Sequence, residues 1–159
     1  SVMSFFLHDS VCIDENVLIG DNTKIWHFTH ISENVKIGKN VTIGQNVFID
    51  KNVEIGDNCK IQNNVSIYKG VYLGKNVFIG PSVVFTNDLY PSVENWDESL
   101  LVKTFIKDNV SIGANSTILC GVTLNDSCMV GAGSLVLKSI KKNFLAYGHP
   151  AKEIRDLKK

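Results

Sequence analysis

The chain has 159 residues, of which 44% are hydrophobic, and 16 Lys or Arg balance 16 Asp or Glu. This length suits one domain with a substantial core, and the balanced charge argues against nucleic acid as a partner. No apolar run reaches the ~20 residues of a membrane span, and no signal peptide precedes the first repeat. A cytoplasmic protein without a membrane partner is therefore expected.

The chain opens with a lead-in over residues 1–12. Phe5, Phe6 and Leu7 are expected to form an apolar cap there, because a solenoid needs a covered end. The dipeptide ahead of Met3 is interpreted as a remnant of cloning.

Residues 13–87 carry a large apolar residue at every sixth position, from Ile13 to Phe85. Within each hexad the second residue is often Gly, the fourth is mostly Asn and the fifth is mostly Val. A period of six fits neither a helix nor simple strand alternation, but it is typical of the short strands and corners of a parallel β-helix. Asn and Gly suit the corners because both tolerate the left-handed backbone region.

Residues that are 18 positions apart are of nearly the same type, so they form columns along the chain. Three hexads therefore form one coil, which predicts a triangular prism with three flat faces. Charges alternate along one corner of this prism, which predicts a solvated edge without stacked like charges. The column that shows this consists of Asp21, Lys39, Asp57 and Lys75.

The second half of the chain repeats the pattern after an interruption. Residues 88–105 break the period and are expected to form an external loop. The period resumes over 106–140 in a shifted register, and 141–159 is a basic tail in which 151–159 is expected to form a short closing helix. The expected fold class is therefore all-β, a parallel β-helix with one external loop and a short C-terminal helix.

One corner column is uncharged at neutral pH but rich in hydrogen-bonding groups: His27, Gln45, Asn63 and Pro81. In its first hexad, Trp26 replaces the common Gly and Phe28 replaces the common Asn. Departures from a local pattern mark functional sites, and an aromatic pair at a corner also fits a protein interface. The two interpretations merge if the site lies between subunits.

Across essentially its whole length the chain resembles the left-handed β-helix, or hexapeptide-repeat, acyltransferases. The segments VGAGSLV (130–136) and GHPAKEI (148–154) resemble their coenzyme A end, with His149 in place of the usual Asn. The segments IWHF, GQNVFI, KIQNNVSIY and GPSVVFTND resemble more narrowly the nucleotide-sugar 3-N-acetyltransferases. The left-handed winding is implied by this resemblance alone, since crossovers are usually right-handed.

The resemblance implies an activity and an assembly. Enzymes of this kind transfer acetyl from acetyl-CoA to the 3-amino group of a nucleotide-linked sugar, for bacterial surface glycans. They are homotrimers whose active sites lie between subunits. The chemistry needs the two reactants held together, one proton accepted and an oxyanion stabilised.

Two residues are the catalytic candidates. His27 is the expected base, because histidine titrates near neutral pH, and its alternative role is to hydrogen-bond the sugar. Asn87, which ends the "FTN" segment, resembles the family's substrate-orienting Asn, and its alternative role is to form a turn before the loop.

The substrate is expected to contact the same corner and the loop. Trp26, Gln45 and Asn63 would bind the sugar or position its amine. Tyr90 and Trp96 would stack on the nucleotide base. Their alternative role is only to anchor the loop.

Acetyl-CoA is expected in the groove between neighbouring prisms. Ala114 and Ala132 are small enough for close backbone contact, and basic residues near the C-terminus offer charge to its phosphates. The remaining expected contacts are Ser134, Lys138, Gly148, Pro150, Lys152 and Arg155.

The loop bears on the choice of sugar. It contains no Arg and, near its end, only Lys103, whereas a uronic acid calls for a bidentate Arg. This favours a neutral 3-amino-3,6-dideoxyhexose on dTDP, with a UDP-linked 3-amino uronic acid as the alternative.

Two other classes of protein fit less well. A β-helical carbonic anhydrase needs three His converging on zinc, and His27 and His30 have no third His at coil spacing, so no metal is expected. A structural or ice-binding solenoid would repeat a flat Thr or Asn array and lack the loop. The cysteines show no CxxC spacing and are expected to be reduced thiols; they are Cys12, Cys59, Cys120 and Cys128.

Overall fold

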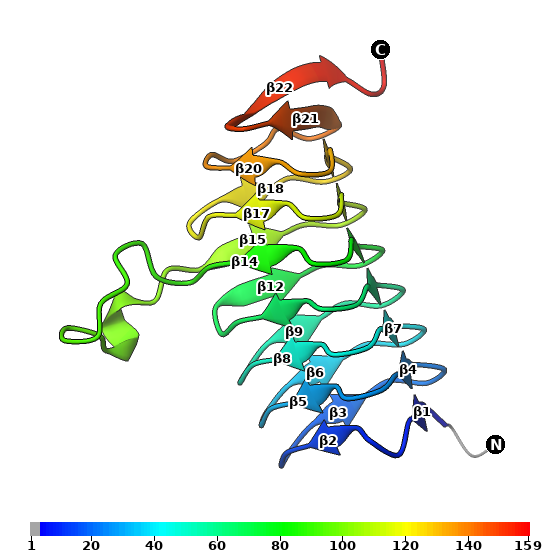
Figure 1. Cartoon of the computed structure of the whole chain (residues 1–159). Helices are drawn as coiled ribbons and strands as arrows, with labels where there is room; N and C mark the ends of the chain where they lie inside the picture. The colour runs from blue at the N-terminus through cyan, green and yellow to red at the C-terminus, as the bar shows by residue number, and fades with distance from the viewer. Residues whose placement is uncertain (1–3) are drawn as a thin grey trace.

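The computed structural model describes residues 4–159 as a left-handed parallel β-helix (Figure 1). The expected all-β class, a parallel β-helix with one external loop, is confirmed. The dipeptide ahead of Met3 and Met3 itself lie outside the described residues. Within the described part of the chain, no helix is long and apolar enough to cross a membrane.

The strands form three sheets, one on each face of the prism. Sheet A contains β1 (Phe6–Leu7), β4 (Lys24–Ile25), β7 (Thr42–Ile43), β10 (Lys60–Ile61), β13 (Phe78–Ile79), β16 (Ser111–Ile112), β19 (Met129–Val130), β21 (Phe144–Gly148) and β22 (Ala151–Asp156). Sheet B contains β2 (Cys12–Ile13), β5 (His30–Ile31), β8 (Phe48–Ile49), β11 (Ser66–Ile67), β14 (Val84–Phe85), β17 (Thr117–Ile118) and β20 (Leu135–Val136). Sheet C contains β3 (Leu18–Ile19), β6 (Lys36–Ile37), β9 (Glu54–Ile55), β12 (Val71–Leu73), β15 (Thr104–Ile106) and β18 (Thr123–Leu124).

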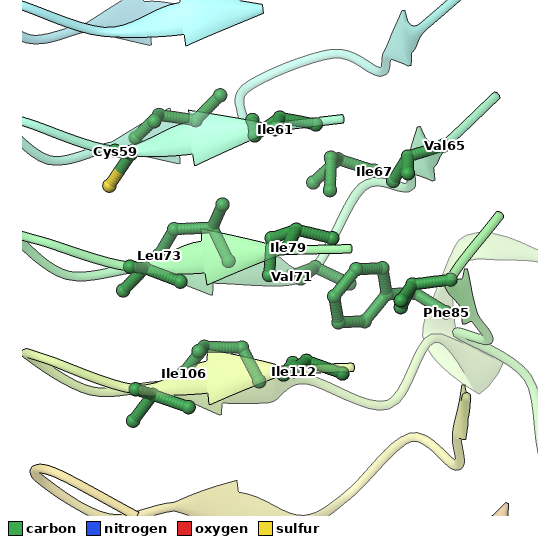
Figure 2. Packing of buried hydrophobic residues seen from close by; sticks show 14 of the residues in the cluster. Cys59, Ile61, Val65, Ile67, Val71, Leu73, Ile79, Phe85, Ile106 and Ile112 are labelled. Atoms are coloured by element: carbon green, nitrogen blue, oxygen red, sulfur yellow. The ribbon is translucent and has the colours of Figure 1, made fainter. Parts of the chain in front are cut away.

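The core consists of the first and fifth residues of the hexads, stacked coil upon coil. Figure 2 shows Ile61, Ile79 and Ile112 above one another, all pointing into the prism, and each is at most 1% exposed. Burying each such side chain contributes about 1.5–3 kcal/mol relative to exposure. The core is thus one continuous column, as the period of six predicts.

The corners use Asn and Gly for different reasons. The fourth residue of a hexad has a positive φ, for example 59° at Asn22 and 56° at Asn40, as expected. The glycines at the second position do not, so the expectation that they supply the left-handed conformation is wrong. A Cβ on Gly20 would lie 2.5 Å from the carbonyl carbon of Gly38, so these glycines are needed for the close approach of successive coils.

The charged corner between sheets C and A is more than a solvated edge. The carboxylate of Asp57 accepts the backbone N–H of Lys39 at 2.9 Å, and that of Asp108 accepts the N–H of Lys75 at 2.8 Å. Asp57, and Asp108 one coil after Lys75 in the same column, therefore satisfy backbone donors of the preceding coil.

The two ends of the prism depart from expectation. Of the expected cap, only Leu7 packs against the core, whereas Phe5 and Phe6 are both 45% exposed. The predicted closing helix over 151–159 is wrong, because β22 pairs antiparallel with β21. A helix of this length is marginal in water, and the hairpin instead closes the last edge of sheet A and buries Ala146.

The interruption of the repeat is a loop between β14 and β15 that projects from the prism (Figure 1). It contains one short 3-10 helix, η1 (Glu98–Leu100), whose N-cap is Asp97. The sheet closes across its base, because β12 pairs with β15 on the far side of the loop.

Candidate active site

Several of the predicted substrate and coenzyme A contacts lie on one edge of the prism, the corner between sheets A and B, here called the A–B corner. From His27 to Ala114, the backbone carbonyl of each residue in this column accepts an N–H from the next coil, at 2.8–3.0 Å. The two small residues predicted to contact coenzyme A continue the column of predicted substrate contacts. The full column is His27, Gln45, Asn63, Pro81, Ala114 and Ala132.

His27 lies within an aromatic cluster at the start of this column. The indole of Trp26 lies nearly parallel to its ring, with centroids 6.3 Å apart, and the ring centroid of Phe28 lies 6.0 Å away. Trp26 is 39% exposed and Phe28 is 66% exposed. Phe28 has a φ of 59°, in the left-handed region that Asn occupies in most other hexads. This hexad therefore has an apolar outer surface and a strained backbone.

His8 is a member of the cluster that sequence reasoning missed. Its ring stacks on that of His27 with 3.5 Å between centroids. The His8 Nδ1 atom lies 2.8 Å from the Ser10 hydroxyl, which accepts the backbone N–H of Phe28 at 2.8 Å. The signal was available, because His8 precedes Trp26 by the 18 residues of one coil.

The next two residues of the column are joined to one another. The side-chain oxygen of Asn63 accepts the backbone N–H of Gln45 at 2.8 Å. The Asn63 oxygen therefore stabilises the corner, while its amide N–H₂ and the exposed Gln45 side chain face outward.

Asn87 lies on a different edge, the corner between sheets B and C. Its side-chain nitrogen donates to the carbonyl of Lys69 at 3.1 Å, and its own carbonyl accepts the N–H of Val102 at 2.9 Å. Asn87 thus fastens the base of the loop. Three strand steps along sheet B separate it from the level of His27, about 14 Å at ~4.8 Å per step, so a single chain does not bring the two catalytic candidates together.

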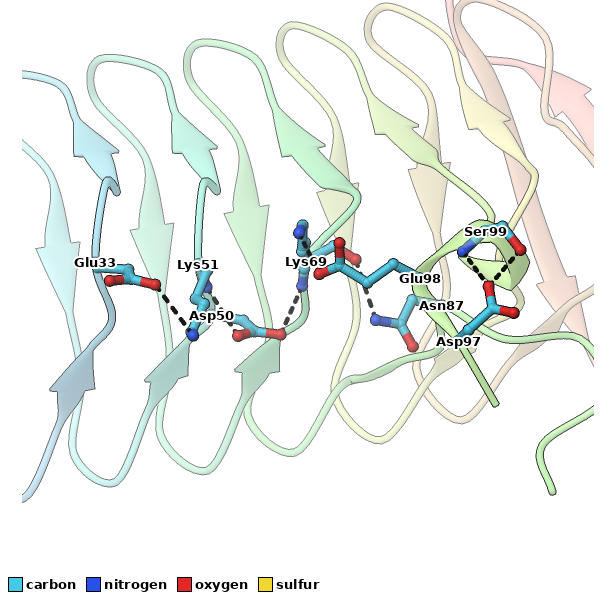
Figure 3. A network of polar contacts seen from close by, with 8 residues as sticks. All are labelled: Glu33, Asp50, Lys51, Lys69, Asn87, Asp97, Glu98 and Ser99. Atoms are coloured by element: carbon cyan, nitrogen blue, oxygen red, sulfur yellow. Dashed lines mark hydrogen bonds and ion pairs between the residues drawn. The ribbon is translucent and has the colours of Figure 1, made fainter. Parts of the chain in front are cut away.

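A chain of polar contacts supports this loop (Figure 3). The Lys69 ammonium lies 2.7 Å from the Glu98 carboxylate, and the Lys69 N–H donates to Asp50 at 3.0 Å. The Lys69 contact holds the pKa of Glu98 below its ordinary value. The loop is therefore attached to the prism at both Asn87 and Glu98.

The loop aromatics are placed differently from one another. Trp96 and Asn87 line a shared groove of about 450 Å³ together with Asp88, Pro91, Ser92 and Val93. Tyr90 does not line this groove and is 86% exposed. Of the two aromatics predicted to stack on a base, only Trp96 lies beside a candidate catalytic residue.

The predicted coenzyme A residues near the C-terminus fall into three groups. Lys138, Pro150 and Lys152 line a pocket of about 430 Å³ below the β21–β22 hairpin. Ser134 is buried, donates to the Gly131 carbonyl at 2.6 Å and accepts the N–H of Gly148 at 3.2 Å, so these residues shape the turn. Arg155 lies exposed on β22, outside the pocket lining.

The buried thiols are unsuited to nucleophilic chemistry. Burial raises the pKa of Cys59 to about 11 and that of Cys128 to about 12. Cys120 is also buried, whereas Cys12 is exposed, and all four cysteines are free.

The coiled hexads define the class of hexapeptide-repeat solenoids. A family model described as bacterial transferase hexapeptide (six repeats) matches residues 8–51, 52–87 and 103–138. A second, the hexapeptide repeat of succinyl-transferase, matches 34–69. The first match covers well over half of the chain, and the protein belongs to the bacterial transferase hexapeptide family.

Individual relatives agree with this assignment. A dTDP-3-amino-3,6-dideoxy-alpha-D-galactopyranose 3-N-acetyltransferase of Aneurinibacillus thermoaerophilus is 48% identical over 50 residues, which is 31% of this chain and 26% of that enzyme. A hexapeptide transferase family protein of Anaplasma phagocytophilum superposes with a TM-score of 0.67 at 25% identity, covering 97% of this chain and 80% of that one. A galactoside acetyltransferase in complex with coenzyme A gives a TM-score of 0.60 at 32% identity, covering 70% and 59%.

Proposed function

We propose that this protein is an acetyl-CoA-dependent N-acetyltransferase that acylates the 3-amino group of a nucleotide-linked 3-amino-3,6-dideoxyhexose. The observation that carries the proposal is the A–B corner, which aligns the base candidate His27 with the small residues Ala114 and Ala132 on one edge. The local similarity to a dTDP-3-amino-sugar 3-N-acetyltransferase supports the reaction and the dTDP carrier. A role in the cytoplasmic synthesis of bacterial surface glycans follows from this substrate class.

The reaction needs few groups. The neutral 3-amine attacks the thioester carbonyl of acetyl-CoA and forms a C–N bond. His27 accepts the proton that the amine loses. The C–S bond then breaks, and coenzyme A leaves as a thiolate that is protonated to the thiol, so that atoms and charge balance. A positioned base of this kind contributes about 10²–10⁴ in rate, and the alignment of the reactants contributes further.

We also propose that the site is completed by assembly into a homotrimer. Within one chain, His27 and Asn87 lie on different edges of the prism and at different levels. The exposed aromatic pair Trp26 and Phe28 sits beside His27, where an apolar surface of this kind favours a subunit contact. In the proposed trimer a neighbouring copy brings its loop, with Asn87 and Trp96, to this corner.

The charges around the loop favour a neutral sugar. Lys69 is already paired with Glu98, and the loop segment contributes only Lys103, which is exposed. A carboxylate on the sugar would call for a bidentate Arg. The UDP-linked 3-amino uronic acid therefore remains the alternative substrate.

The test is release of the coenzyme A thiol from acetyl-CoA in the presence of a panel of dTDP- and UDP-linked amino sugars. We expect turnover with a dTDP-linked 3-amino sugar, weak turnover with the 3-amino uronic acid, and none with the matching 4-amino sugar. Lys39→Asn, on the corner between sheets C and A, serves as a control that keeps activity. Turnover of the uronic acid alone would replace the favoured substrate with the alternative, and release with none of the panel would overturn the proposal.

A further inference from the structure

A cluster of three metal-ligating side chains lies on the outer face of sheet B, away from the A–B corner column. It consists of Cys12, Asp14 and His30, whose ligand atoms all lie within 4.8 Å of one another. The His30 Nε2 atom is 3.0 Å from the Asp14 carboxylate. Cys12 is directly opposite His30 in the pairing of β2 with β5, at the N-terminal end of the prism (Figure 1).

The backbone holds the three ligands in place. The N–H of Cys12 donates to the carbonyl of Thr29 at 3.0 Å, and the N–H of Asp14 donates to the carbonyl of Ile31 at 2.9 Å. These two bonds flank His30 on both sides, so the two strands cannot slip relative to one another without breaking them. The side chains of Cys12 and Asp14 therefore point to the same face as His30, since residues two apart in a strand share a face.

The first coils carry more negative than positive charge, and one ligand has restricted mobility. Residues 4–36 contain five carboxylates and only two cationic side chains, Lys24 and Lys36. The imidazole of His30 packs against Phe48 with ring centroids 5.5 Å apart, which restricts its rotation. Both features reduce the cost of gathering the ligands around a positive ion.

We propose that Cys12, Asp14 and His30 form a binding site for Zn²⁺ or a similar divalent transition metal. A thiolate, an imidazole and a carboxylate are zinc ligands, and three of them leave the fourth tetrahedral position for water. Zinc–ligand bonds of ~2.0–2.3 Å place neighbouring ligand atoms about 3.5 Å from one another. Side-chain rotations that move the ligand atoms by roughly 1 Å therefore complete the site. Mg²⁺ and Ca²⁺ are disfavoured because they prefer oxygen ligands.

The position of the site gives it a structural consequence. The first coil is the open end of the prism, where Ile13 and Ile19 are only partly buried, whereas Ile31 in the second coil is fully buried. A metal held by Cys12, Asp14 and His30 links these two coils. On binding, the Cys12 thiol and any protonated imidazole release their protons to solvent, so affinity falls as the pH is lowered.

The test uses the full chain without an affinity tag, stripped of metal and kept reduced, and titrated with Co²⁺. We expect one Co²⁺ per chain, with a thiolate-to-cobalt charge-transfer band that Zn²⁺ displaces and Mg²⁺ does not. Cys12→Ser abolishes the band. Asp14→Asn and His30→Gln each weaken affinity by more than the ~10–100-fold that follows loss of an outer-shell partner.

Two neighbouring residues of the same types provide matched controls. His8→Gln and Glu15→Gln alter a nearby imidazole and a nearby carboxylate outside the cluster, and both variants are expected to keep the affinity of the wild type. A band that survives Cys12→Ser, or equal losses in the control variants, would overturn the proposal.

A second measurement needs no variant. One equivalent of Zn²⁺ should slow the alkylation of Cys12 in the wild-type chain and raise its Tm. An unchanged alkylation rate would refute the site even if the variants failed to fold. Because neither readout depends on acetyl transfer, the result is independent of the proposed enzyme activity.

Discussion

The imidazole rings of His8 and His27 stack face to face, 3.5 Å between centroids with 27° between their planes. His8 comes from the preceding coil, so the proposed base packs against a residue about one turn away in the chain. His27→Asn keeps hydrogen-bonding capacity but removes basicity. We expect it to lower kcat by about 10²-fold or more and to leave KM for the nucleotide sugar nearly unchanged.

The pH–rate profile of this variant discriminates between the two roles of His27. If the acidic limb of the wild-type profile persists unshifted in His27→Asn, the titrating proton belongs to the amine of the sugar. His27 would then be a binding residue, and the variant would raise KM while sparing kcat.

Phe28 offers a test of both backbone strain and assembly. A non-glycine residue in the left-handed region costs roughly 1–2 kcal/mol, and Asn bears that cost best. Phe28→Asn and Phe28→Ala both remove the exposed ring, and light scattering should show that both weaken the trimer. The free energy of unfolding, measured in urea, should be about 1 kcal/mol higher for Phe28→Asn than for Phe28→Ala. A wild-type mass equal to one chain at micromolar concentration would contradict the shared site.

The repeat predicts which positions carry the stability. Ile43 is fully buried in the core, and Ile43→Ala should lower the free energy of unfolding by about 2–5 kcal/mol. Lys39 lies on an exposed corner, and Lys39→Ala should cost less than ~0.5 kcal/mol. Urea unfolding with equal midpoints for the two variants would be incompatible with the assignment of inner and outer positions.

Asn87 can be tested for a chemical role and an anchoring role at once. Asn87→Ala removes the bond to the Lys69 carbonyl, a net loss of about 1 kcal/mol for the base of the loop. We expect faster proteolysis within 88–101 and a pH–rate profile of lower height but unchanged shape. Ser92→Ala, within the loop, is the control for proteolysis. A fall in kcat without faster proteolysis would assign Asn87 to the chemistry alone.

The buried thiols predict an alkaline loss of stability. Burial raises the pKa of Cys59 from 9.0 to about 11, so above pH 9.0 the folded chain keeps a proton that the unfolded chain has lost. The stability due to this thiol is complete below pH 9.0 and disappears as the pH rises through about 11. Urea midpoints measured across this range should therefore decline.

Cys59→Thr is the matched variant for that experiment. Thr23, at the same hexad position, donates its hydroxyl to the carbonyl of Gly38 at 2.8 Å, as the Cys59 thiol donates to that of Gly74 at 3.0 Å. The variant keeps the donor and removes the titration, so its alkaline decline should be smaller than that of the wild type. An identical decline would attribute the effect to other groups.

The period of six determines the prism because every coil repeats the same choice of inner and outer residues. The same column reading places Cys12 beside His30, 18 residues apart, and places His8 at the level of Trp26, next to His27. The C-terminal hairpin could not be predicted in this way. Its strands form because β19 offers an unpaired edge, and that edge exists only once the rest of sheet A has assembled.

The loop base shows how this fold accommodates change. Tyr72 pairs with Glu54 in the coil before it, 18 residues away, and with Phe105 in the coil after it, 33 residues away. The 15 additional residues form the loop, which leaves the stacked strands at one corner and rejoins them at the same corner. The pairing of all later strands is unchanged. A coil is therefore closed by the matching of strands and not by the length of chain between them. Lengthening or exchanging that one segment alters the surface offered to a ligand while the prism that carries it stays the same.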